Sequence, residues 1–148
     1  MRTTADLIVC SPDDRVQLIV EVKNRKGATD EWAAHMRRNL LVHAMIPSTR
    51  FFLLVLPEYF YLWGPDQLVE ATSVDYKVAS REVLKRFLGD AKLEDLSEES
   101  LELLVNSWLS QVISSPLGKE SLPELSWIFD SGLYESIRGG SIRAESAV

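Results

Sequence analysis

"LIVEVKNR", residues 18–25, ends an apolar run with a carboxylate and an ammonium group two residues apart. The runs "ADLIVC" (5–10) and "VQLIVEVK" (16–23) are aliphatic and β-branched, and "SPDDR" between them has the proline and paired aspartates that favour a turn. This pattern predicts a β-hairpin. Because both faces of each strand are apolar, we expect the hairpin to lie centrally in a sheet that is covered on both sides.

The predicted hairpin brings charged side chains together on one face. With the turn centred between Asp13 and Asp14, the residue opposite Glu21 is Asp6. Directly paired residues have Cβ atoms about 4.5–5.5 Å apart, and Lys23 shares their face by the two-residue period of a strand. Two facing carboxylates repel unless a positive charge lies between them. Lys23 can supply this charge, and a divalent cation such as Mg²⁺, which prefers oxygen ligands, can supply it better.

A helix is predicted directly after the hairpin. Thr29 can cap it, Asp30 and Glu31 suit its first turn, and Pro47 stops a run that ends near Met45. The pattern thus changes from the two-residue period of a strand to that of a helix.

The rest of the chain is predicted to form a second strand pair and then helices. These elements are strands at 50–56 and 59–63, helices at 80–89 and 97–113, and a short element in "PELSWIFDSGLYESI". The last ten residues are expected to be disordered. We therefore expect an α/β core with a mixed central sheet flanked by helices over residues 1–113, and a C-terminal extension over residues 114–148.

Composition limits the class of protein. A chain of 148 residues with 46% hydrophobic and 26% charged residues suits one globular domain. The single cysteine, Cys10, excludes an internal disulfide framework, and the N-terminus has no signal-peptide or membrane-spanning pattern, so we expect a soluble cytoplasmic protein with no membrane partner. The net charge of -6 argues against a general nucleic-acid coat protein. Residues 1–50, however, hold 8 Lys and Arg against 6 Asp and Glu, a net +2, whereas the remainder holds 8 against 16, a net -8.

Asp6 with "EVK" at residues 21–23 resembles the motif of the PD-(D/E)XK nuclease superfamily, which has the restriction-endonuclease-like fold. That motif is an Asp at the start of one strand followed, after a hairpin, by Glu-x-Lys. The resemblance implies that Asp6, Glu21 and the backbone carbonyl of Val22 bind Mg²⁺ or Mn²⁺, and that Lys23 positions or activates the attacking water. The catalytic residues expected from the resemblance are thus Asp6, Glu21 and Lys23.

The resemblance covers about residues 5–63. Many members related to helicase-associated nucleases carry Gln-x-x-x-Tyr on the helix after the hairpin, and here His35 and Asn39 take those two positions. The spacing of four places both side chains on one helix face, where they could reach a phosphate or brace the site. The literal Pro12-Asp13 pair lies in the predicted turn, at the far end of the hairpin from Glu21, and is interpreted as turn chemistry.

The chain departs from the family pattern before the first strand. The family core normally begins with a helix that often carries another acidic residue, and only five residues precede Asp6. We expect this N-terminal core helix to be missing: lost from the chain, supplied by another chain, or absent from a shortened gene product.

Each functional interpretation has a structural alternative. Asp6 with Glu21 and Lys23 could form an ordinary edge-strand salt bridge, and His35 with Asn39 could lie on a solvated helix face. A basic group flanks the proposed site and could contact nucleic-acid phosphates or be plain solvated surface; beside Lys23 it comprises Arg25, Lys26, Arg37 and Arg38.

The expected function is that of a Mg²⁺-dependent nuclease, a phosphodiesterase that hydrolyses DNA. The alternative is a catalytically degenerate protein of the same fold that binds nucleic acid or another protein, and a third reading is a nuclease subunit completed by dimerisation. The missing helix, the substituted His35 and Asn39 and the pI of about 4.9 favour the alternative. A homodimer is expected, because the apolar stripe over 101–112 and the missing helix leave sheet surface that a monomer would expose.

Overall fold

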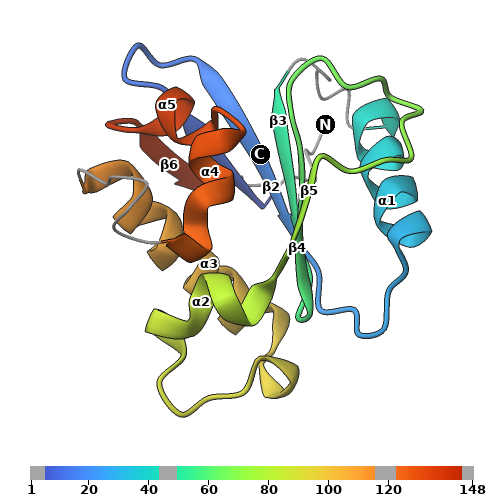
Figure 1. Ribbon diagram of the computed structural model, residues 1–148, viewed down its shortest axis with the longest axis vertical. Helices are drawn as coiled ribbons and strands as arrows, with labels where there is room; N and C mark the ends of the chain where they lie inside the picture. The colour runs from blue at the N-terminus through green and yellow to red at the C-terminus, as the bar shows by residue number, and fades with distance from the viewer. Residues whose placement is uncertain (1–5, 44–49, 116–122, 145–148) are drawn as a thin grey trace.

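The computed structural model describes residues 6–43, 50–115 and 123–144, which form a six-stranded mixed sheet with helices on both faces (Figure 1). The order of strands across the sheet is β5-β4-β3-β2-β1-β6. Strands β2 and β3 are parallel, and every other neighbouring pair is antiparallel. The strands are β1 (Leu7–Cys10), β2 (Val16–Val22), β3 (Phe51–Val55), β4 (Tyr59–Trp63), β5 (Tyr76–Ala79) and β6 (Ser141–Ala144).

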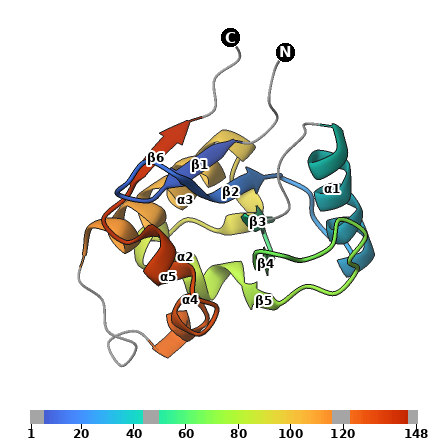
Figure 2. The ribbon, with the colours of Figure 1, turned by 90° about the horizontal axis from the view of Figure 1, so that it is seen from above.

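The helices are divided unequally between the two faces of the sheet (Figure 2). Among the described helices, α1 (Asp30–His43) is the one on the first face, where residues of the β4–β5 connection pack as well. The opposite face is covered by α2 (Ser80–Leu88), α3 (Glu98–Ser114), α4 (Ser126–Asp130) and α5 (Leu133–Ile137), together with the short 3₁₀ turns η1 (Leu93–Asp95) and η2 (Pro123–Leu125). None of the described helices is long and apolar enough to span a membrane.

The predicted hairpin is confirmed, and so is its register over most of its length. Leu7 pairs with Val20 and Val9 with Leu18, as a turn centred between residues 13 and 14 requires, before a bulge at Cys10. The alternation of a strand then sends Leu18 and Val20 into the core under α3 and leaves the neighbouring odd-numbered positions on the face of α1. The hairpin lies inside the sheet, between β3 and β6, as its two apolar faces predicted.

Helix α1 begins where the sequence predicted. The backbone N–H of Trp32 donates to Thr29 Oγ1 at 3.0 Å, so Thr29 is the cap. The predicted stop, at Met45 and Pro47, lies outside the described residues. Because α1 connects β2 to the parallel neighbour β3, it is the crossover that places the end of β2 beside the end of β3.

The C-terminal segment contains a strand within the last ten residues, which were expected to be disordered. Residues 141–144 form the edge strand β6, which pairs with β1, so disorder was the wrong prediction for them. The approach of β6 to β1 requires a glycine, because a Cβ at Gly140 would lie 1.9 Å from the carbonyl oxygen of Cys10. Ile128, Leu133 and Ile137 are buried in the same core as β1 and β2. Residues 123–144 are therefore part of the same hydrophobic core as the preceding elements.

The apolar stripe of α3 is covered within the chain. Its buried members pack against the sheet and against α4 and α5, and they are Leu101, Val105, Trp108, Leu109 and Val112. Trp108 also stacks on Trp127, with ring centroids 5.8 Å apart. This packing removes the stripe as a reason to expect a homodimer. Leu103, on the outer side of α3, is 68% exposed.

A candidate acidic site at the end of the hairpin

The predicted triad lies where β2 leaves the sheet. The backbone N–H of Asp6 donates to the carbonyl of Val20 at 3.0 Å, which extends the hairpin pairing by one residue. The carboxylate of Asp6 accepts a hydrogen bond from the N–H of Val22 at 2.7 Å. Lys23 continues from β2, and its N–H donates to the carbonyl of Val55, the last residue of β3, at 3.0 Å. The structure therefore brings Asp6, Glu21 and Lys23 together, as the sequence predicted.

Glu21 is a buried carboxylate that has one partner, Lys23, among the described residues. Its side chain is 1% exposed, and Oε1 lies 3.0 Å from the Lys23 ammonium. The other oxygen, Oε2, has no hydrogen-bond partner in the described part of the chain. Burial, and then the charge of Asp6, raise the pKa of Glu21 to about 7, although Lys23 opposes this shift. An unpaired buried acceptor costs about 1–3 kcal/mol, so this position is unfavourable without a further partner.

Lys23 is held in its charged form. Burial lowers its pKa, but the hydrogen bond and charge of Glu21, together with the neighbouring carboxylates, outweigh burial and raise the pKa above the usual value. The side chain is 35% exposed, so the ammonium group can face both Glu21 and solvent. In this arrangement Lys23 supplies positive charge or donates a hydrogen bond, and it does not act as a base.

Two further carboxylates reach the site from α3, and neither was predicted from the sequence. Glu98 Oε1 accepts a hydrogen bond from the backbone N–H of Asn24 at 2.8 Å, directly after Lys23. Glu102 lies one helical turn further along. Burial raises the pKa of Glu102, as do the charges of Asp6 and Glu98 and a side-chain hydrogen bond with Asp6. Burial is the largest cause of the raised pKa of Asp6, and the charge of Glu98 adds to it, whereas the Val22 N–H, the charge of Lys23 and Glu102 oppose it.

The only local signal for these residues was their spacing. Positions 98 and 102 are four apart and share one face of a helix. Ser97 caps that helix, accepting the N–H of Ser100 at 3.1 Å, and acidic residues in a first turn are usual because they stabilise the helix dipole. The sequence therefore offered an ordinary explanation for Glu98, and only the tertiary fold places it beside the hairpin.

The carboxylate oxygens near the end of β2 are suitable ligands for a hard cation. In their present conformations, however, these side chains do not converge on one position. Carboxylate oxygens are the ligands that Mg²⁺ and Mn²⁺ prefer, and Glu21 Oε2 is a buried acceptor without a partner. No group of three or more His, Cys, Asp or Glu side chains among the described residues is close enough to hold a metal. Asp6 is directed to the Val22 N–H and Glu21 to Lys23, so cation binding requires at least one of these carboxylates to turn.

Arg37 is buried, whereas a residue that contacts a phosphate must be at the surface. The predicted phosphate contact of Arg37 is therefore wrong. It is 1% exposed, and its guanidinium donates to the carbonyls of Leu68 at 3.0 Å and Gln67 at 3.2 Å. The group also lies over the ring of Trp63, 5.4 Å from the centroid. Arg37 therefore fastens the β4–β5 connection to α1.

The other predicted binding residues lie on the surface. Arg25 and Lys26 are exposed on the loop between β2 and α1, and Arg25 packs over the ring of Trp32, 4.8 Å from the centroid. On α1, Arg38 is exposed and its Nη2 lies 2.8 Å from His35 Nδ1. Asn39 is also exposed. His35 and Asn39 thus share the solvent side of α1.

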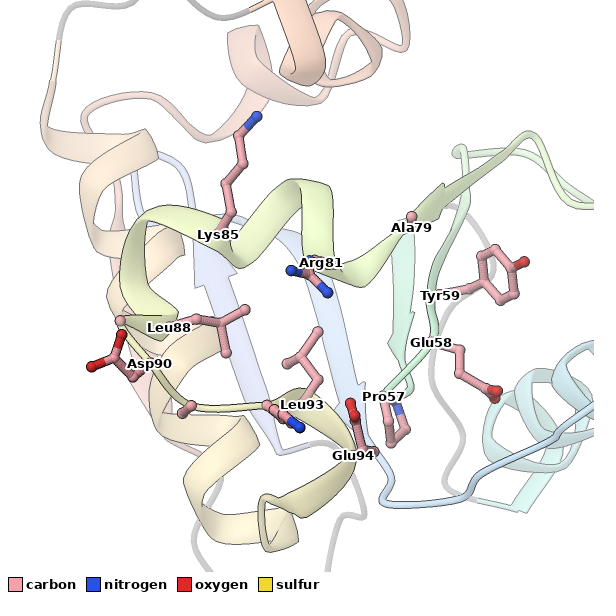
Figure 3. A pocket seen from close by; sticks show the side chains of 13 residues that line it. Pro57, Glu58, Tyr59, Ala79, Arg81, Lys85, Leu88, Asp90, Leu93 and Glu94 are labelled. Atoms are coloured by element: carbon pink, nitrogen blue, oxygen red, sulfur yellow. The ribbon is translucent and has the colours of Figure 1, made fainter.

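A cavity of about 670 Å³ opens at the same end of the sheet (Figure 3). It lies between the β3–β4 turn, the start of α2 and the loop that leads to η1, with Arg81 and Glu94 among its labelled side chains. Glu58, on its rim, accepts the N–H of Gly27 at 2.8 Å and so joins the cavity wall to the β2–α1 loop. Its charged side chains are of both signs, three basic and three acidic: Arg81, Lys85, Lys92, Glu58, Asp90 and Glu94.

Comparison of the chain with protein-family models, curated protein sequences and solved structures finds no match.

Proposed function

We propose that the protein is a nuclease of the restriction-endonuclease-like fold that uses Mg²⁺ or Mn²⁺ to hydrolyse phosphodiester bonds in DNA. The observation that carries this proposal is the convergence of Asp6, Glu21 and Lys23, with Glu21 Oε2 buried and without a partner in the described chain. The order of hairpin, crossover helix and parallel strand supports it as well, because this order places the three side chains at one end of β2.

Each residue has a distinct part in the proposed reaction. Asp6, Glu21 and the backbone carbonyl of Val22 hold the cation. When bound, the cation would act as a Lewis acid that polarises the scissile phosphate and lowers the pKa of an attacking water. The Lys23 ammonium, already charged and partly exposed, stabilises the negative charge that develops on the phosphate. Arg25 and Lys26, on the adjoining loop, are placed to contact phosphates further along the strand.

The test is cleavage of single- and double-stranded DNA with Mg²⁺ or Mn²⁺. The wild type should cleave, Asp6→Asn should lose both cleavage and metal-dependent thermal stabilisation, and Lys23→Ala should lose cleavage while it still binds the metal. Lys92→Ala, which removes an exposed lysine on the cavity, is the matched control and should cleave as the wild type does. If the wild type cleaves neither single- nor double-stranded DNA, the nuclease proposal is refuted.

A second candidate function is a degenerate module of the same fold that binds nucleic acid or protein. It is favoured by the absence of a preformed cluster of three ligands in the described residues. In that case DNA binding should persist without any metal response, and Lys23→Ala should weaken binding only as any lost surface cation does.

A further inference from the structure

Tyr59 is an exposed aromatic residue at the start of β4. Tyr61 and Trp63, on the same face of the strand, are each 1% exposed because they pack in the core under α1, whereas Tyr59 is 39% exposed. The Tyr61 hydroxyl donates to Asp30 Oδ1, on the first residue of α1, at 3.0 Å. Tyr59 therefore lies beyond the start of the helix, and its cross-strand partner, Ala79, is too small to cover the ring.

The Tyr59 ring is held in place by its neighbours. The Lys77 ammonium lies 4.2 Å from the centroid of the ring, and it also forms an ion pair with Asp30 at 2.8 Å. The Tyr61 ring meets it at an angle of 63° between the planes, with centroids 6.2 Å apart. Figure 3 shows the Tyr59 side chain directed away from Arg81 and the cavity. A fixed and partly exposed ring can stack on a flat group from outside with little loss of side-chain entropy.

Arg25 carries a positive charge that has no carboxylate partner. Its guanidinium lies 4.8 Å from the centroid of the Trp32 ring, and Trp32 packs against the core under α1. Among the described residues, neither Arg25 nor Lys26 forms an ion pair with an acidic side chain. An aromatic ring thus positions Arg25, so its charge and its N–H groups are left for an anion from outside.

A hydrogen bond joins the loop that carries Arg25 to the residue before Tyr59. The N–H of Gly27 donates to Glu58 Oε1 at 2.8 Å. At its other end this loop begins at Lys23, whose N–H is bonded to the carbonyl of the last residue of β3 at 3.0 Å. The proposed catalytic lysine, the basic loop and the exposed ring therefore lie together at one end of the sheet.

This combination of groups suits an unpaired strand of DNA. Phosphates match the charges of Arg25 and Lys26, and a base matches the ring of Tyr59. In a duplex both faces of each base are covered by its neighbours in the stack, so a protein ring stacks on a base that is unpaired. An acidic peptide would match the charges alone.

We propose that Tyr59 stacks on a base of single-stranded DNA, while Arg25 and Lys26 bind phosphates of the same strand. This inference rests on the proposed function, because it specifies the form of DNA that the same site receives. It makes Tyr59 a binding residue and Trp32 a positioning residue for Arg25.

The test is fluorescence anisotropy of a labelled thymidine strand, about 12 nucleotides long, titrated at low salt with the full chain in EDTA so that no metal-dependent cleavage occurs. Tyr59→Leu should weaken binding at least about fivefold, the loss expected when one stack of a base on an aromatic ring is removed. Tyr59→Phe keeps the ring and should bind within about twofold of the wild type. Tyr76→Leu is the matched control on the neighbouring strand β5, because Tyr76 packs in the core on the opposite face of the sheet, and it should also bind as the wild type does.

A strand of the same length without bases separates stacking from phosphate contact. The wild type should bind this abasic strand at least about fivefold more weakly than the thymidine strand, and Tyr59→Leu should bind the two strands within about twofold of each other. A duplex of the same length should bind Tyr59→Leu and the wild type alike. Equal affinity of the wild type for the thymidine and abasic strands overturns the inference, and so does a loss by Tyr59→Leu that is as large for the duplex.

Folding and function are controlled separately. If thermal melting shows that Tyr59→Leu does not fold, Tyr59→Thr, which also favours a strand, replaces it and should show the same loss; wild-type affinity in that variant overturns the inference. A wild type that binds the thymidine strand through Tyr59 and cleaves no DNA refutes the nuclease proposal alone. A wild type that cleaves DNA while Tyr59→Leu binds like Tyr76→Leu refutes this inference alone.

Discussion

At the scale of single residues, Glu21 makes stability depend on pH. Its pKa rises from 4.5 to about 7 on folding, mainly because it is buried. Between these values the unfolded chain has released the proton that the folded chain keeps, so the free energy of unfolding falls as pH rises. Asp6 and Glu102 face Glu21 or each other and have raised pKa values, which add to the effect with the same sign, while Lys23 stays charged throughout.

Urea unfolding in EDTA at pH 5 and pH 8 measures this dependence. The wild type should lose roughly 1–3 kcal/mol of stability between the two values. Glu21→Gln keeps the shape of the side chain without its charge, so it should lose at most about half as much. It also removes the ion pair with Lys23, whose ammonium is exposed enough to be solvated instead. If the wild type and Glu21→Gln lose the same amount of stability, another group causes the pH dependence.

At the scale of elements, α1 has two neighbouring arginines with opposite roles. Arg37 is buried against Trp63 and donates to two backbone carbonyls, whereas Arg38 is exposed. Arg37→Ala should destabilise the protein by about 2–4 kcal/mol, because it leaves a cavity and two carbonyls without donors. Arg38→Ala, on the next position of the same helix, should change stability by less than about 0.5 kcal/mol. Chemical unfolding of both variants gives the comparison.

The same two variants test whether the basic surface of α1 contacts DNA. If Arg38 contacts a DNA phosphate, its removal should reduce the slope of log affinity against log salt by about 1, because one fewer counterion is released. Arg37→Ala should leave this slope unchanged wherever the variant is folded. A lower slope for Arg37→Ala and not for Arg38→Ala would mean that the helix faces DNA differently from its position here.

At the scale of the whole molecule, local patterns predicted the elements better than their assembly. The hairpin, the Thr29 cap and the strands at 51–55 and 59–63 follow from alternation, turn residues and capping, which act over a few positions. Strand β6 has only four residues, and its partner β1 lies at the other end of the chain, so no local pattern marks it. The same limit applies to the site. Asp6 and Glu21 belong to one hairpin and were predicted, whereas Glu102 reaches them only through the packing of α3.

The edge strand β6 gives the last prediction, because it pairs with β1, the strand that directly follows Asp6 and lies between β2 and β6. A Cβ at Gly140 would lie 1.9 Å from the Cys10 carbonyl oxygen and 2.9 Å from that of Ile137, and both contacts are with backbone that cannot turn aside. Gly140→Ala must therefore displace β6.

The matched control for this substitution is Gly89→Ala. Gly89 has a positive φ of 58° and open space around its Cβ position, so alanine there adds backbone strain without a collision. It should cost about 1–3 kcal/mol, and Gly140→Ala should cost at least about 2 kcal/mol more in urea unfolding. Because displaced β6 also frees the outer edge of β1, hydrogen exchange at the N–H of Cys10, which is on the side of β1 that faces β6, should accelerate in Gly140→Ala and stay unchanged in Gly89→Ala. Equal destabilisation by the two alanines would mean that β6 is not needed to hold the strand that carries Asp6.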